Sequence, residues 1–192
     1  MPPRHPCTPS PSNRSASNFL KLSRQEEAEL YRTIRIYWRE AKRCEAAGAH
    51  FSCCVMLGSL LEGMLMLMVN AYPEEAKATG KIPQRGGRPM NLIGWNLTQL
   101  LQVADATAWL PSGEHSHPSS RHRKRQIGDY AKIVRDVRNL VHPGRYVTDH
   151  ARKRVTKRYS LHLFEVVEIC KDWLLAHNNV VLRVDLLQEG LL

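Results

Sequence analysis

The feature that most constrains the fold of this chain is a long apolar segment, Phe51 to Tyr72, with hardly any polar interruption. A helix built from this segment is apolar on nearly every side, and such a helix has to be buried among other elements. Its most apolar part, 55–69, is too short for a membrane span and contains Glu62 and two glycines. We therefore expect a central core helix, ended by Pro73, in which methionines fill space, and no membrane partner.

Four further segments repeat apolar residues every three or four positions, which is typical of helices with one buried face. They span about 23–48, 92–110, 125–141 and 152–177. No long alternating pattern of the kind found in strands precedes residue 179. The sequence therefore predicts an all-α fold, an up-and-down bundle of about five helices.

Local signals indicate where these helices begin and end. Ser23 and Glu26 have the spacing of a capping box, and Gly48 can end the first helix in the left-handed conformation. Asn91 can cap the helix that follows the central one, and Pro111 should stop it. The bundle is thus expected to have short, well-defined connections.

Composition divides the chain into three parts. Residues 1–22 are rich in Pro, Ser and Asn and cannot bury enough apolar surface to offset the entropy of ordering, so we expect a flexible, disordered tail. The helical bundle domain is predicted over 23–178. Residues 179–192 form a C-terminal extension, either a short strand or an apolar tail that docks on a partner. The Gly- and Pro-rich segment 78–90 matches no phosphate-binding loop and is interpreted as a linker with two accessible arginines.

The cysteines indicate a reducing compartment. The chain has five Cys, an odd number, and no CxxC pair or Cys/His cluster has the spacing of a zinc site. His115 and His117 alternate in a loop, but further ligands are not spaced nearby. We expect reduced, buried thiols, no metal and no cofactor. The N-terminus has no apolar signal core, so a cytoplasmic location is expected.

The net charge favours a polyanionic partner. Lys plus Arg number 28 and Asp plus Glu 18, which gives a formal charge of +10. Such a charge suits nucleic acid, although a basic surface can also serve solubility alone. Two basic runs, 121–125 and 152–158, could build a positive field for RNA. Aromatic side chains near them are scarce, which argues against sequence-specific reading of single strands.

One segment carries residues suited to phosphate chemistry, RDVRNLVHPGRY at 135–146. On a helix, Arg135, Arg138 and His142 share one polar strip, because residues three, four and seven apart lie on one side. Arg offers a rigid fork for phosphate oxygens, and His can move a proton near neutral pH. The same strip could instead be a solvated face, with Asn139 and His142 capping carbonyls at the helix end.

Glu62 is the lone charge in the apolar part of the central helix. A buried carboxylate needs a cation or several hydrogen-bond donors. We expect Glu62 to pair with Arg135 or Arg138. The alternative is that it reaches an end of the bundle or a lysine.

The segment 135–146 resembles the signature of the HEPN superfamily of helical bundle proteins, an Arg, four to six residues, then His. Here Asp136 follows Arg135, and six residues separate Arg135 from His142. Arg138 and Asn139 resemble the more familiar Arg-Asn form, but His142 follows Arg138 at only the fourth position. Which arginine is the counterpart stays open. The likeness extends over about residues 24–178.

This resemblance implies a homodimer whose motif helices face each other. In active members the paired Arg and His residues form a metal-independent ribonuclease site, in which an RNA 2′-hydroxyl attacks the adjacent phosphate. His142 would then shuttle the proton, and Arg135 or Arg138 would stabilise the phosphorane. Asn139 completes the predicted catalytic set, and Asn139 or Asp136 would orient its groups. The predicted supporting residues are Asp136, Glu62, Arg145 and Tyr146. Other members are catalytically silent, so a non-catalytic interaction module or a nucleotide-binding subunit is the alternative.

Overall fold

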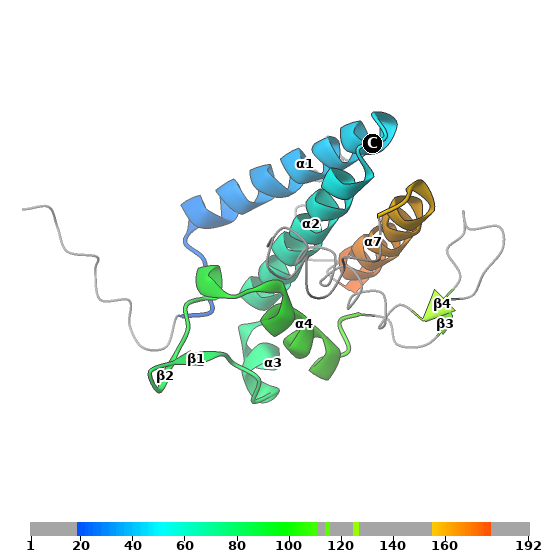
Figure 1. Cartoon of the computed structure of the whole chain (residues 1–192). Coiled ribbons are helices and arrows are strands. Elements are labelled where there is room, and N and C mark those ends of the chain that lie inside the picture. Colours follow the sequence, from blue (N-terminus) through cyan, green and yellow to red (C-terminus); the bar gives the residue numbers. More distant parts are fainter. Residues whose placement is uncertain (1–18, 111–113, 116–124, 127–154, 178–192) are drawn as a thin grey trace, which may run out of the picture.

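The computed structural model describes residues 19–110, 114–115, 125–126 and 155–177 (Figure 1). Most of these residues are helical, which confirms the all-α class. The helices are α1 (Arg24–Ala46), α2 (His50–Ala71), α3 (Pro73–Ala78), the 3-10 turn η1 (Leu92–Gly94), α4 (Leu97–Ala106) and α7 (Lys157–His177). Two short antiparallel strand pairs complete the described part, β1 (Gln84–Arg85) with β2 (Arg88–Pro89) and β3 (Glu114–His115) with β4 (Arg125–Gln126).

Helix α1 begins and ends as its sequence predicts. The Ser23 hydroxyl accepts from the backbone N–H of Glu26, and the Glu26 carboxylate accepts from the backbone N–H of Ser23, which is a complete capping box. At the other end Gly48 has a φ of 71°. The backbone N–H of Gly48 bonds to Glu45 and that of Ala49 to Cys44, so the chain turns sharply into α2.

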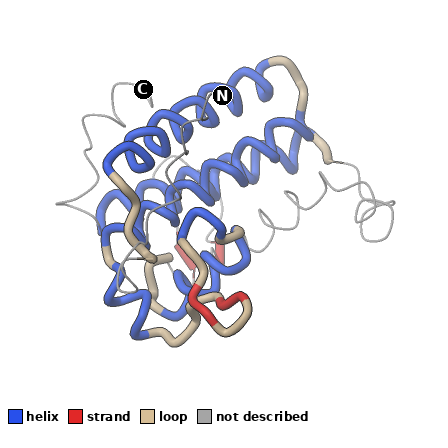
Figure 2. The backbone as a smooth tube through the Cα atoms, turned by 90° about the vertical axis from the view of Figure 1, so that its left-hand side faces the viewer, coloured by secondary structure: helices blue, strands red, loops and turns tan. Residues whose placement is uncertain are grey.

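Helix α2 is the central helix, as predicted. Its fully buried side chains include Leu57, Leu61, Leu65 and Met68. It packs against α1, α4 and α7, so three helices share its apolar surface (Figures 1 and 2). Because Pro73 lacks an N–H that the preceding turn could use, α2 ends before it, and the same proline then begins α3.

Helix α7 lies beside α2 and runs parallel to it. The His50 ring at the start of α2 is 3.0 Å from the Ser160 hydroxyl near the start of α7. Further along, the Phe164 ring meets the Trp38 ring of α1 edge-on, with centroids 5.6 Å apart. The helix begins at Lys157 rather than at about residue 152, since residues 155–156 precede it.

The segment after α3 differs from the single helix predicted over 92–110. Leu92–Gly94 forms one 3-10 turn, the chain extends at Trp95, and α4 starts after Asn96. Asn96, not Asn91, makes the capping box, with Gln99 as its partner. A second capping signal, two residues after the 3-10 turn ends, therefore marks the helix start. Helix α4 ends at Ala106, before Pro111 could act.

Two other predicted boundaries are wrong within the described residues. The tail predicted over 1–22 includes Leu20, which is fully buried, and the backbone N–H of Leu22 donates to Asn70 of α2 at 2.8 Å. Lys21 Nζ also donates to the Asn70 carbonyl, and the Leu92 N–H donates to the Phe19 carbonyl. Residues 19–22 are thus fixed on the core, because these three hydrogen bonds and the buried leucine offset the entropy of ordering. The helix predicted from Arg125 is not helical at 125–126, which pair with β3. Residues 1–18, 127–141 and 179–192 lie outside the described part.

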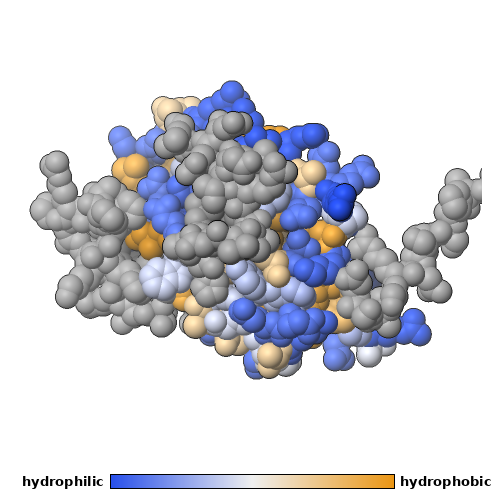
Figure 3. Space-filling view, turned by 180° about the vertical axis from the view of Figure 1, so that it is seen from behind, coloured by the Kyte–Doolittle hydropathy of each residue, from blue (hydrophilic) through white to orange (hydrophobic). Residues whose placement is uncertain are grey.

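The surface of the described residues combines hydrophilic and apolar side chains. Seen from behind, it is mainly hydrophilic with apolar patches between (Figure 3). The exposed large hydrophobic side chains are Ile36, Phe51, Ile93, Leu161 and Trp173. Helix α2 is long and apolar enough to cross a membrane, but 67% of its most apolar window is buried inside the fold. Core helices of soluble proteins share that property.

Candidate functional site

The predicted motif falls in a part of the chain that the structure does not describe. Arg135, Asp136, Arg138, Asn139 and His142 lie outside the described residues. Arg145 and Tyr146 lie outside them as well. Of the predicted site residues, the structure describes Glu62 alone, so the geometry that follows is that of the surroundings of Glu62.

Glu62 directly precedes Gly63, where α2 packs closely against α1. A Cβ atom at the neighbouring Gly63 would come 2.8 Å from Ile34 Cγ1 and 3.4 Å from Leu30 Cδ1. The absence of a side chain at Gly63 therefore permits this close packing. Glu62 is half-buried and its Oε2 atom is shielded from solvent. Its predicted pairing with an arginine of the motif stays a prediction.

Helix α1 carries two buried hydrogen-bond donors about one turn apart. Because α1 and α2 are antiparallel and Ile34 meets Gly63, Arg35 comes to the level of Glu62. Arg35 Nε and the indole Nε1 of Trp38 are both buried, and neither has a hydrogen-bond acceptor among the described residues. Buried donors of this kind are uncommon in folded proteins and often accompany an acceptor such as water or an ion.

Cations gather around the Trp38 ring. Lys42 Nζ lies 5.2 Å from the ring centroid and Lys171 Nζ of α7 lies 5.4 Å from it. The negative face of the indole attracts both ammonium groups. Lys171 is also 3.3 Å from the carboxylate of Asp172. The ring thus holds positive charge from two helices at one place.

A Ser–His pair joins α2 and α7, but it is not arranged for nucleophilic catalysis. The Ser160 hydroxyl donates to the carbonyl of Lys157 at 3.0 Å, so its proton does not face His50. His50 Nδ1 then acts as the donor to Ser160 Oγ. Ser160 is fully buried, so no substrate can reach its oxygen. The pair links the first turn of α2 to the first turn of α7.

The described cysteines are buried or half-buried thiols, as predicted. Burial raises the pKa of Cys53, Cys54 and Cys170 to about 12 each, and the neighbouring Cys54 adds to the shift of Cys53. Such thiols are poor nucleophiles, because the thiolate is the reactive form. Within the described ranges, no three His, Cys, Asp or Glu side chains gather as a metal site would require.

The segment 78–90 exposes its two arginines, as predicted. Arg85 and Arg88 are exposed on a β-hairpin that the sequence interpretation treated only as a linker. The Gly86-Gly87 dipeptide between them was the signal that could have predicted the hairpin.

The cluster on α1 could also have been found from sequence. Arg35, Trp38 and Lys42 follow each other at spacings of three and four, which places them on one side of a helix. That Lys171 joins them depends on tertiary packing between distant segments, which spacing along one helix does not reveal.

Comparisons with protein-family models, with curated proteins and with solved structures find no match to this chain.

Proposed function

We propose that this chain is a HEPN-like RNA-binding protein that acts as a metal-independent endoribonuclease in the cytoplasm, as a homodimeric helical bundle. The observation that carries the proposal is the spacing of Arg135, Arg138 and His142 in the segment 135–146. Two guanidiniums and one imidazole on one strip suit a phosphate that gains charge during transfer. No cofactor or metal enters this chemistry.

The roles follow from the chemistry of each group. His142 takes the proton of the attacking 2′-hydroxyl, because an imidazole can exchange protons near neutral pH. Arg135 or Arg138 stabilises the charge on the phosphorane. Asn139 and Asp136 orient these groups.

Features of the described part support the proposal. The described residues are mainly helical, and Glu62 is a half-buried carboxylate on the central helix, where a cation would stabilise it. The formal charge of +10 favours a polyanionic substrate.

The deciding experiment is cleavage of a mixed-sequence RNA in EDTA by the full chain. We expect the wild type to cut and to leave cyclic phosphate ends. His142→Ala should lower the rate by about 100-fold or more, as loss of an acid–base group does. Arg135→Ala and Arg138→Ala, compared with each other, identify the motif arginine as the one whose loss lowers the rate by a similar factor.

A matched control is Arg39→Ala, which removes one exposed cation from α1. Its rate should stay within about twofold of the wild type, because one exposed surface charge is screened by salt. If the wild type binds RNA but leaves it whole over many sequences and structures, the protein is a non-catalytic interaction module. If His142→Ala cuts as fast as the wild type, the proposed site is wrong.

A further inference from the structure

The β1–β2 hairpin presents two arginines at its tip in a fixed arrangement. Gly86 and Gly87 both have positive φ, 59° and 75°, which makes the two-residue turn of a tight hairpin. Arg85 and Arg88 flank the turn and are directly opposite each other. Directly opposite side chains of an antiparallel pair lie on the same face of the ribbon. The two guanidinium groups therefore share one side of a projecting tip.

The two opposed arginines destabilise the hairpin unless an anion binds to them. Like charges directly opposite each other destabilise a hairpin. Neither guanidinium makes a hydrogen bond or an ion pair within the part that the structure describes. The sequence has no Asp or Glu between Glu75 and Asp105. The carboxylates of α3 are engaged elsewhere, Glu74 with Lys77 at 2.8 Å and Glu75 with Trp109 at 2.9 Å.

The base of the hairpin is anchored, so the tip is held in place. The backbone N–H of Met90 donates to the carbonyl of Pro83 at 2.8 Å, and the indole of Trp95 donates to the carbonyl of Met90 at 3.1 Å. Ile82 and Met90 pack against the core. By contrast, added Cβ atoms at the two turn glycines would meet nothing within 4 Å. A fixed base and an open tip suit a contact with a large partner.

We propose that the β1–β2 hairpin binds the phosphate backbone of nucleic acid, with Arg85 and Arg88 on the phosphates and Lys81 adding charge at the base. Arginine forks match phosphate oxygens in a bidentate manner. The tip holds glycines and no aromatic or aliphatic side chain, so it offers nothing to insert into a lipid bilayer. It also has no stacking ring, so the contact is independent of base sequence.

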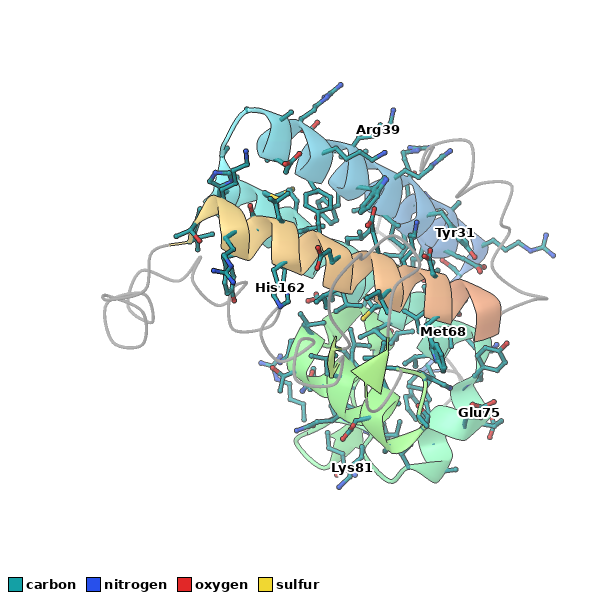
Figure 4. All side chains as sticks on the ribbon, turned by 90° about the vertical axis from the view of Figure 1, so that its right-hand side faces the viewer. Tyr31, Arg39, Met68, Glu75, Lys81 and His162 are labelled. Carbon is teal, nitrogen blue, oxygen red and sulfur yellow. The ribbon has the colours of Figure 1, made fainter. Side chains whose placement is uncertain are left out.

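This surface is separate from the cluster on α1. Figure 4 places Lys81 and Arg39 at opposite ends of the molecule. Holding a phosphate backbone needs no reacting group, so the proposal is independent of the ribonuclease activity. It adds a binding surface that positions the strand.

The test is binding of a fluorescent 2′-O-methyl RNA by anisotropy over a range of salt concentrations. This RNA has no free 2′-hydroxyl, so cleavage cannot interfere. For Arg85→Gln/Arg88→Gln we expect the slope of log affinity against log salt to fall by about 1.4, from two lost single-strand phosphate contacts. That slope corresponds to roughly 25-fold weaker binding at 0.1 M salt.

Two further variants distinguish the effect of the hairpin arginines on affinity from the effect of net charge. Arg32→Gln/Arg43→Gln removes the same charge from α1, where each arginine has a nearby glutamate, and should lower affinity by less than about threefold. Arg85→Lys/Arg88→Lys keeps the charge but loses the fork and should recover most of the salt slope.

Three results would overturn the proposal. One is equal loss of binding in the hairpin and α1 variants, which would mean that only net charge matters. Another is a wild type that does not bind the RNA. The third is binding to vesicles with anionic lipid in preference to RNA. A failure of RNA cleavage with the hairpin effect intact would count against the ribonuclease proposal alone.

Discussion

Two regions of this molecule differ in whether the N–H of a buried indole has a hydrogen-bond acceptor. In the segment 72–110, the Trp109 ring is fully buried beside Tyr72, and its Nε1 donates to Glu75 at 2.9 Å. In the helical triad, defined as α1, α2 and α7, Trp38 is equally buried, but its Nε1 has no acceptor within the described residues. Lysines from two helices approach the Trp38 ring instead.

The difference shows which region provides hydrogen-bond partners for its own buried polar groups. The segment 72–110 satisfies its polar groups locally, through the capping box of Asn96 and the bond from Trp95 to Met90. It is therefore a stable support for the basic hairpin. The helical triad keeps two buried donors, Arg35 Nε and Trp38 Nε1, that have no acceptor among the described residues. Polar groups without local partners are where binding or catalysis is usually found.

The largest expected difference between the two regions is in how alkaline pH changes their contribution to the free energy of unfolding. The thiols with pKa raised from 9.0 to about 12, Cys53, Cys54 and Cys170, are all in the helical triad. Above pH 9 the unfolded chain releases these protons and the folded chain keeps them, so stability is intact below pH 9 and falls as pH rises towards 12. Each thiol contributes about 1.4 kcal/mol per pH unit.

Urea unfolding between pH 8 and 10.5 measures this loss. Cys54→Ala should lower the slope of the free energy of unfolding against pH. Val69→Ala is the matched control and should leave the slope unchanged, since it shortens a fully buried side chain of α2 that has no ionisable group. An unchanged slope for Cys54→Ala would show that its burial does not control its protonation.

Substitution of Gly63 should disrupt the helical triad. Gly63→Val places branched carbon atoms against Ile34, whose Cγ1 would be 2.8 Å from the new Cβ. We expect a loss of about 3 kcal/mol from forced separation of α1 and α2. Gly94→Val is the control in the other region, because its Cβ would meet only the flexible end of Met90 at 3.4 Å. A smaller loss at Gly63 than at Gly94, measured by thermal unfolding, would contradict the close packing.

The two indoles allow a direct comparison of their N–H groups. Trp109→Phe keeps an aromatic ring but leaves Glu75 without its indole donor, whereas Trp38→Phe removes a donor that has no described acceptor. Since both changes remove similar volume, Trp109→Phe should cost about 1–2 kcal/mol more. Chemical denaturation of both variants, with Glu75→Gln to complete a double-mutant cycle, checks the difference. Equal losses would mean that the Nε1 of Trp38 is also bonded in the folded protein.

The sequence predicted those parts of the fold that depend on local chemistry. The capping box at Ser23, the turn at Gly48 and the burial of α2 were predictable because each depends on neighbouring residues or on one uniform apolar stretch. The start of α4 was not, since Asn91 and Asn96 are both suitable caps, and the buried Leu92 and Trp95 lie in the turn between them.

The surroundings of Glu62 were predictable only in part. The sequence identified Glu62 as a charge in an apolar helix, and the structure shows it half-buried. It could not show that Arg35 lies at the same level, because that follows from the register of α1 against α2. The Lys171 contact with Trp38 joins residues far apart in the chain, where hydrophobic periodicity carries no information.

The smallest expected effect is that of a substitution at Arg35. Arg35→Met keeps the apolar stem and removes a buried Nε–H that has no acceptor within the described part of the chain. The free energy of unfolding should change by less than about 0.5 kcal/mol, because no described hydrogen bond is lost. Gln99→Met is the reference in the other region. It removes the side-chain acceptor for the Asn96 N–H and should cost about 0.5–1 kcal/mol.

The order of these two small losses decides whether the two regions differ in how they satisfy their buried polar groups. If Arg35→Met costs less than Gln99→Met, the helical triad holds a guanidinium that the fold itself does not need, and such a group is available for a partner. If Arg35→Met costs 2 kcal/mol or more, on the order of a buried hydrogen bond to a charged group, then Arg35 has an acceptor in the folded protein. In that case the helical triad would be as complete as the segment 72–110, and the contrast between the two regions would disappear.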